Sequence, residues 1–122
     1  MNCNILVLED EPLIALDIAM TLEEAGYNDV VICHSIKEAT ELLVKITPKI
    51  ALLDFSFKNG TTSVSVAKQL KESNTPFIFL TGNTQATIKT PDELQPAAHI
   101  NKPFQGVDLV TKVQSVLNVP QS

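Results

Sequence analysis

Six residues with side chains suited to chemistry close or follow short apolar runs of this sequence. They are Glu9, Asp10, Glu11, Asp54, Thr81 and Lys102. If the carboxylates converge, each pair repels by roughly 4 kcal/mol at about 4 Å and an effective dielectric near 20, so the site calls for a cation. Oxygen ligands in a crevice open to water favour Mg²⁺, or Mn²⁺, which keeps several waters and accepts a phosphate oxygen. The residue types therefore predict a divalent-cation site.

The same residues suit phosphoryl transfer to a carboxylate. Asp54 is the candidate nucleophile, which would attack a phosphorus atom bound to a good leaving group and form an acyl phosphate. The Lys102 ammonium and the Thr81 hydroxyl are expected to neutralise and hydrogen-bond the phosphoryl oxygens as charge spreads over them.

Each of these residues also has a purely structural explanation. Acidic residues before Pro12 suit the start of a helix, Asp54 suits the start of a turn, and Thr81 suits a turn cap. These explanations must hold independently, whereas one chemistry accounts for all of the residues together. We therefore favour the functional interpretation.

The elements that must position these residues are visible as an alternation along the chain. Short β-branched apolar runs alternate with segments of helical period, which is typical of a parallel α/β sheet. The predicted strands are 4–9, 30–34, 50–54, 76–81 and 97–101. In an open parallel sheet the functional crevice lies outside the carboxyl ends of the strands, where all six residues fall.

The helices are predicted from apolar residues at helical spacing. One stripe runs from Ile14 to Ala25 and stops at Gly26, and a second runs from Ile36 to Ile46 before Pro48. A third helix is expected around 66–70 and a last one over 109–117. Between 82 and 95 two prolines interrupt a weak pattern, so the fourth helix is expected to be short or irregular.

Length and composition restrict the class of protein. A chain of 122 residues with 44% hydrophobic and 19% charged residues has the size and core of one domain. The net charge is -5 and all nine cationic residues are lysines, so direct nucleic-acid binding is disfavoured. The apolar runs are too short for a membrane span and no basic-then-apolar leader opens the chain, so we expect a cytoplasmic protein without membrane contact.

Four short motifs, in this order, resemble the receiver domain of bacterial two-component response regulators, the CheY-like superfamily. They are Val7-Leu8-Glu9-Asp10-Glu11, Leu52-Leu53-Asp54, Phe79-Leu80-Thr81-Gly82 and Asn101-Lys102-Pro103-Phe104. The resemblance covers the whole chain, with a core at about 3–118. It implies a flavodoxin-like, doubly wound fold with three α/β/α layers and five parallel strands in the order 2-1-3-4-5.

The resemblance also implies roles for individual residues. Glu9 and Asp10 match the metal-binding acidic pair, with Asp10 the closer ligand, and Asp54 matches the phosphoacceptor. Ser56 matches the position whose backbone carbonyl completes the metal shell. Thr81 and Lys102 match the switch hydroxyl and the phosphate-binding lysine. A cis peptide between Lys102 and Pro103 is also implied.

Departures from the family pattern concern the surface that transmits the signal. The residues Phe57-Lys58-Asn59-Gly60 replace a frequent hydrophobic-Pro step, so the loop over the site differs. Gly82 stands where alanine is usual, and His99 stands where Tyr or Phe is usual. We expect His99, Gly82 and Pro103 to form the switch and partner surface, with phosphorylation ordering the segment 82–95.

The implied function is that of a stand-alone regulator. It would receive a phosphoryl group from a histidine kinase or a histidine phosphotransfer protein, and then bind a target protein or act as a phosphate sink. A receiver cut from a larger protein is an alternative. The chain would be no enzyme beyond its own phosphorylation and dephosphorylation.

Rival functions come from other classes of protein. A haloacid dehalogenase-type phosphatase or a toprim-like nuclease requires a second Asp two residues after an acidic residue. Two residues after Asp54 this chain has Ser56. A flavin-binding fold of this topology needs a phosphate loop in place of the first acidic cluster. A receiver-fold interaction module that no longer takes phosphate is expected to lack one of the site residues, and none is missing.

Overall fold

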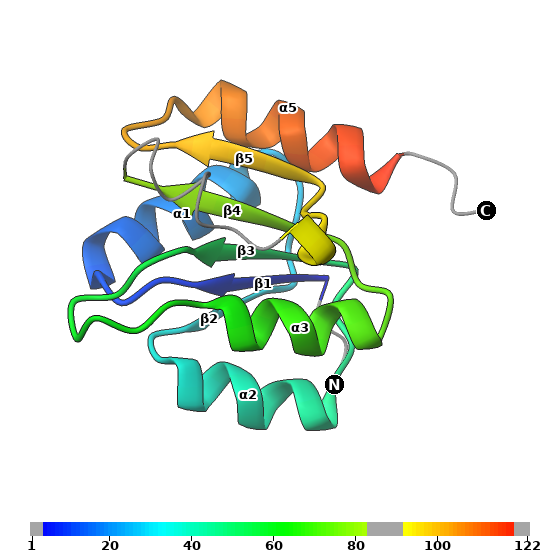
Figure 1. The fold of residues 1–122 in the computed structure, drawn as a ribbon. Coiled ribbons are helices and arrows are strands. Elements are labelled where there is room, and N and C mark those ends of the chain that lie inside the picture. Colours follow the sequence, from blue (N-terminus) through cyan, green and yellow to red (C-terminus); the bar gives the residue numbers. More distant parts are fainter. Residues whose placement is uncertain (1–3, 83–91, 119–122) are drawn as a thin grey trace.

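The computed structural model of the protein, which describes residues 4–82 and 92–118, is built around a five-stranded parallel sheet (Figure 1). The strands are β1 (Ile5–Leu8), β2 (Val30–Cys33), β3 (Ile50–Asp54), β4 (Phe77–Thr81) and β5 (Ala98–Asn101). Their order is β2-β1-β3-β4-β5, which confirms the predicted flavodoxin-like topology. Each predicted strand agrees with the observed one to within one residue at either end.

Within the described residues, four helices cover the two faces of the sheet (Figure 1). They are α1 (Pro12–Glu24), α2 (Ile36–Lys45), α3 (Val64–Glu72) and α5 (Gly106–Leu117). Helices α1 and α5 pack on one face and α2 and α3 on the other, so the fold has the three predicted layers.

Strand residues alternate between the two halves of the core. In β1, Ile5 and Val7 pack toward α1 and α5, whereas Leu6 and Leu8 pack toward α2 and α3. Strands β3 and β4 alternate in the same way, and every residue of β1, β3 and β4 is buried. Strands covered on both faces need nearly continuous apolar runs, which explains the sequence pattern.

Local signals set the helix ends. Helix α1 begins at Pro12, whose missing N–H costs nothing at a first helical position, and Gly26 follows its end with a φ of 102°. Ser35 caps α2 by accepting a hydrogen bond from the backbone N–H of Glu38 at 3.1 Å. None of the helices in the described ranges is long and apolar enough to cross a membrane.

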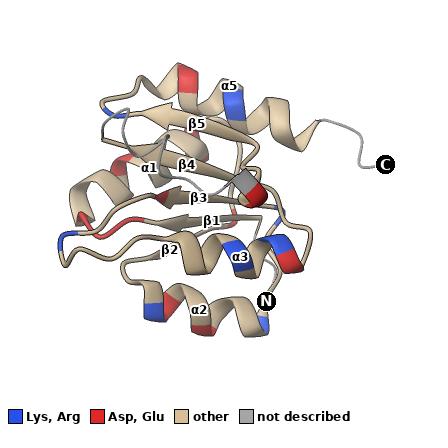
Figure 2. Cartoon of the chain, viewed as in Figure 1, with Lys and Arg blue, Asp and Glu red and all other residues tan. Residues whose placement is uncertain are grey.

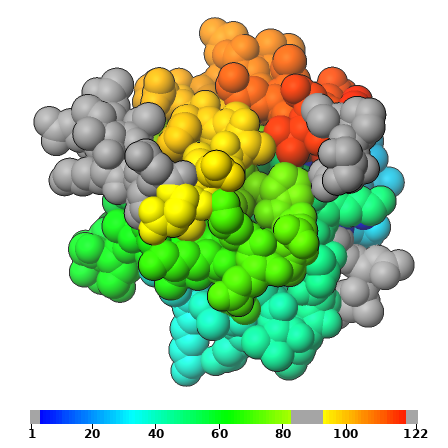
Figure 3. Space-filling view, turned by 45° about the vertical axis from the view of Figure 1, so that its right-hand side comes forward, coloured from blue at the N-terminus to red at the C-terminus, as the bar shows by residue number. Residues whose placement is uncertain are grey.

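The fourth connection is described only in part. Most of the segment 82–95, including the expected short or irregular fourth helix and its ordering by phosphate, lies outside the described residues. The described end is a short 3₁₀ helix, η1 (Asp92–Leu94), whose Leu94 is buried in the core beneath α3. Figure 3 shows η1 in yellow beside the green of α3, with α5 in orange above them.

Parallel register aligns the carboxyl ends of the strands at one edge. Leu8 pairs with Cys33 on one side and with Leu53 on the other, Asp54 pairs with Leu80, and Thr81 pairs with Asn101. The residues that follow these pairs therefore meet at a single rim of the sheet.

Candidate functional site at the carboxyl edge of the sheet

Three carboxylates converge where β1 and β3 end. Glu9, Asp10 and Asp54 each offer one oxygen atom, and these atoms all lie within 4.8 Å of one another. Glu9 is fully buried and Asp54 is nearly so, while Asp10 is half-buried at the rim. The predicted acidic cluster is therefore present, and we refer to these three residues as the acidic cluster.

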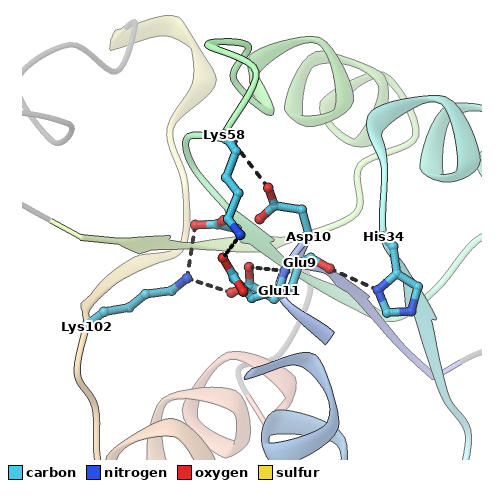
Figure 4. Close-up of polar contacts among 7 residues, drawn as sticks. Glu9, Asp10, Glu11, His34, Lys58 and Lys102 are labelled. Carbon is cyan, nitrogen blue, oxygen red and sulfur yellow. Dashed lines mark hydrogen bonds and ion pairs between the residues drawn. The ribbon is translucent and has the colours of Figure 1, made fainter. Parts of the chain in front are cut away.

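Lys102, which follows β5, joins two members of the acidic cluster (Figure 4). Its Nζ lies 2.5 Å from Glu9 Oε1 and 3.2 Å from Asp54 Oδ1. Burial would lower the pKa of Lys102, but its hydrogen bond to Glu9 and the negative charge of Asp54 outweigh burial and raise the pKa. The lysine is thus held in its charged form beside the two buried carboxylates.

The surroundings of Asp54 strongly perturb its carboxyl group. Burial and the negative charge of Glu9 raise the pKa of Asp54 from 3.8 to about 7, although Lys102 opposes the shift. The acidic cluster is therefore short of positive charge, and its ionised form would be stabilised by a cation.

The loop after β1 is held by contacts to Glu9. The backbone N–H of Glu11 donates to Glu9 Oε2 at 3.2 Å, and Nδ1 of His34 lies 3.3 Å from the carbonyl oxygen of Glu9. The buried Glu9 carboxylate thus has both oxygen atoms engaged, one by Lys102 and the other by its own loop.

The loop between β3 and α3 closes over Asp10 in a way that the sequence did not reveal. The backbone N–H of Lys58 donates to Asp10 Oδ2 at 3.2 Å, and Lys58 Nζ lies 2.5 Å from Glu11 Oε1. In the same loop Ser56 is exposed and pairs with Thr62 in an isolated antiparallel bridge.

Thr81 lies at the same edge but its hydroxyl is directed to a neighbour on β5. Thr81 is buried and its Oγ1 donates to Asn101 Oδ1 at 3.0 Å. Its carbonyl oxygen accepts the backbone N–H of Lys102 at 2.7 Å. Thr81 is thus linked to Lys102 through the main chain, while Asn101 holds its side chain.

Of the residues expected to form the switch surface, Gly82 and Pro103 lie farther along the same edge, whereas His99 lies within β5, opposite Phe79. His99 is half-buried, with its ring centroid 5.8 Å from that of Phe79, and burial lowers the pKa of His99. Gly82 is exposed at the end of β4. The peptide between Lys102 and Pro103 is cis, as expected, and Pro103 lines a pocket of about 310 Å³ together with Ile14 and Phe104.

The donor set of the acidic cluster fits Mg²⁺. All three groups are carboxylates, which are the hard oxygen ligands that this ion prefers, and the half-buried position of Asp10 leaves room for water ligands. The described cluster contains neither the thiolate nor the imidazole that softer metals favour.

Comparisons with known proteins agree with this geometry. The family model described as the response regulator receiver domain matches residues 5–114. The phyllosphere-induced regulator PhyR of Methylorubrum extorquens is 30% identical over all of this chain and 46% of its own length. The phosphate regulon transcriptional regulatory protein PhoB of Pseudomonas aeruginosa is 31% identical over 93% of this chain and 51% of its own length. The chain thus spans about half the length of these curated relatives.

Solved structures show the same fold. A response regulator receiver protein from Sinorhizobium medicae matches with a TM-score of 0.79 at 27% identity, covering 97% of this chain and 96% of that one. A CheY-like receiver domain protein from Methanospirillum hungatei matches with a TM-score of 0.84 at 20% identity, covering 97% and 95%. The second likeness concerns the fold alone.

Proposed function

Because the chain belongs to the response regulator receiver family, we propose that it accepts a phosphoryl group on Asp54, with Mg²⁺, from a phosphohistidine of a histidine kinase or histidine phosphotransfer protein. The observation that carries this proposal is the acidic cluster itself, in which Lys102 bridges the buried Glu9 and the candidate acceptor Asp54.

In the proposed step a carboxylate oxygen of Asp54 attacks the phosphorus atom. The new O–P bond forms as the P–N bond of the donor phosphohistidine breaks, and the electron pair of that bond returns to the imidazole nitrogen. The products are an acyl phosphate on Asp54 and an unphosphorylated histidine on the donor protein. Among the atoms whose bonds change, only the attacking oxygen belongs to this chain.

The other site residues hold charge in place during this transfer. Glu9, Asp10, Asp54 and the Ser56 carbonyl would hold Mg²⁺, which supplies positive charge to the transferring oxygens when bound. Lys102 lies 3.2 Å from Asp54 and would follow the charge onto the phosphoryl group. The Thr81 hydroxyl would leave Asn101 to donate to a phosphoryl oxygen.

The proposed output is phosphorylation-dependent binding of a target protein or removal of phosphate from a branched relay. His99, Gly82 and Pro103 would form the surface that responds. We take 1–122 as one receiver domain, with a core at about 3–118, that works in the cytoplasm, where its kinase displays phosphohistidine. The chain turns over no substrate other than its own phosphoryl group.

Labelling with a small phosphodonor tests the proposal. With acetyl phosphate and Mg²⁺, the protein should gain the mass of one phosphoryl group, and chelation of Mg²⁺ should prevent the gain. Asp54→Asn should remain folded and gain nothing, whereas Asp108→Asn, a control on α5, should label like the wild type. Labelling that persists in Asp54→Asn would place the acceptor elsewhere. A wild-type protein that is never labelled would instead indicate an interaction module that does not take phosphate.

A further inference from the structure

Lys58 contacts two acidic residues of the loop after β1 through two different groups (Figure 4). Its backbone N–H donates to Asp10 Oδ2 at 3.2 Å, and its ammonium lies 2.5 Å from Glu11 Oε1. Forty-eight residues separate Lys58 from Asp10 in sequence, so these contacts fasten the β3–α3 loop across the rim of the acidic cluster. We call this pair of contacts the Lys58 clasp.

The backbone contact orients a proposed metal ligand. Asp10 is half-buried at the rim, and one of its two carboxylate oxygens accepts the N–H of Lys58. A carboxylate held through one oxygen presents the other in a fixed direction, which reduces the cost of ordering it around a cation. A proline at position 58 would lack this N–H and could not make the contact.

The ammonium contact concerns the charge of the site and contributes little to folding. The Lys58 side chain is 75% exposed, and an exposed ion pair of this kind adds little to the stability of a fold. Its charge nevertheless lies beside Glu11 and near enough to Asp10 to attract that carboxylate. Figure 2 shows the acidic residues after β1 together with the basic residue of the β3–α3 loop at the same edge.

The balance of charges at the site indicates that the Lys58 ammonium opposes the binding of a cation. Four carboxylates meet here, on Glu9, Asp10, Glu11 and Asp54, and within the described ranges two ammonium groups contact them, on Lys58 and Lys102. When all are ionised, two negative charges remain. One divalent cation would balance them, and the Lys58 ammonium would repel that cation as it arrives.

We propose that the Lys58 clasp sets the Mg²⁺ affinity of the acidic cluster through two opposed contributions: the backbone N–H positions Asp10 for the ion, and the ammonium acts as a competing counter-charge. Lys58 is thus a positioning residue that shifts the concentration of Mg²⁺ at which phosphoryl uptake occurs. This inference rests on the metal site of the proposed function.

The two contributions predict different Mg²⁺ affinities for two substitutions at one position. Lys58→Met removes the ammonium and keeps the N–H, so it should bind Mg²⁺ about three- to tenfold more tightly than the wild type at low salt. Lys58→Pro removes both groups, so it should bind Mg²⁺ more weakly than Lys58→Met. Lys58→Arg keeps both groups and should restore the wild-type affinity.

Titration with Mg²⁺ alone, followed by amide chemical shifts, measures these dissociation constants without any phosphodonor. Lys68→Met, which removes an exposed charge on α3, is the matched control and should behave like the wild type. The gain shown by Lys58→Met should shrink at high ionic strength, because screening weakens the repulsion that the substitution removes.

The outcomes separate this inference from the proposed function. If the wild type binds Mg²⁺ and Asp54→Asn weakens binding, but Lys58→Met matches the wild type, the clasp proposal is overturned and the metal site stands. Equal affinities of Lys58→Pro and Lys58→Met would overturn the role of the N–H. A wild-type protein whose shifts do not respond to Mg²⁺ would overturn the metal site and the clasp together.

Discussion

The two halves of the sheet edge hold their polar groups by different kinds of interaction. At the ends of β1 and β3, three carboxylates, two of them buried, place oxygen atoms within 4.8 Å of one another, and the Lys102 ammonium joins Glu9 to Asp54. At the ends of β4 and β5, a neutral hydroxyl donates to a neutral amide, from Thr81 to Asn101 at 3.0 Å. We call these the charged half and the neutral half.

The difference indicates how such an edge can be both a binding site and a switch. In the charged half, repulsion between carboxylates makes the metal-free arrangement costly, so a cation has a large effect there. In the neutral half, one exchangeable hydrogen bond holds Thr81, so a new partner can replace Asn101 at small cost. Lys102 joins the halves, because its N–H donates to Thr81 and its ammonium binds Glu9 and Asp54.

Removing the link between the halves should have the largest effect. Lys102→Met leaves the fully buried Glu9 carboxylate without its ammonium, so we expect a loss of about 2–3 kcal/mol in the free energy of unfolding. Labelling by acetyl phosphate should fall at least tenfold. Urea denaturation and intact-mass kinetics measure the two effects, with Lys112→Met on α5 as the control. If Lys112→Met lost as much stability and labelling as Lys102→Met, the effect would come from the overall charge of the protein.

Ionised Asp54 destabilises the folded protein, so the free energy of unfolding should increase when its charge is removed. Because the folded pKa of Asp54 is raised from 3.8 to about 7, its contribution to stability is full below pH 3.8 and is lost as pH rises through 7. Asp54→Asn cannot ionise, so without Mg²⁺ it should be more stable than the wild type by about 2 kcal/mol at pH 8.

Measuring the stability of Asp54→Asn and of the wild type at several pH values provides the control for this prediction. The stability difference between Asp54→Asn and the wild type should be small near pH 4 and should shrink at pH 8 when Mg²⁺ is added. A variant that is less stable than the wild type at pH 8 without Mg²⁺ would mean that the attraction of Lys102 outweighs the burial of Asp54 and the repulsion from Glu9 together.

The charged half was largely predictable from the sequence, for a topological reason. Parallel strands end at one edge, so acidic residues after the runs at 5–8 and 50–53 had to meet, whatever the details of packing. The limits of β1, β2 and β3 were also predictable, because each of these apolar runs is bounded by polar residues. The same reasoning brought Lys102 to that edge, but it did not show that its ammonium pairs with the buried Glu9.

The contacts of Lys58 and of the Thr81 hydroxyl could not be predicted from the sequence, because they depend on the path of a loop and on side-chain rotamers. Lys58 was visible only as a departure from a hydrophobic-Pro step, and its two contacts depend on how the β3–α3 loop turns, with Gly60 at a φ of 86°. Asn101 belongs to one of the four motifs, but nothing in the sequence marked it as the partner of the Thr81 hydroxyl, because that choice is a side-chain orientation that follows no sequence period.

A smaller effect is expected from releasing the hydroxyl in the neutral half. Asn101→Ala removes the acceptor of Thr81, so the hydroxyl no longer has to leave a partner in order to bind a phosphoryl oxygen. Beryllofluoride, a phosphoryl mimic, should bind about two- to fivefold more tightly, which corresponds to one modest hydrogen bond. The comparison is with Thr81→Ala and with the double variant. If Asn101→Ala tightens binding equally in the absence of the Thr81 hydroxyl, the effect does not pass through that hydrogen bond.

The smallest effect concerns His99, which lies on β5 next to the neutral half and should respond to acid in the direction opposite to that of Asp54. Burial lowers the pKa of His99 below 6.5, so its contribution to stability is full above pH 6.5 and is lost as pH falls through the lowered pKa. Its buried Nδ1 has no hydrogen-bond partner among the residues that the structure describes.

His99→Phe removes both the proton-binding group and the unsatisfied nitrogen, and it keeps a ring against Phe79. The variant should therefore be slightly more stable than the wild type, with a larger advantage at pH 5.5 than at pH 8 in thermal unfolding. An advantage that is the same at both pH values would mean that His99 does not titrate on unfolding, and that the neutral half is insensitive to pH.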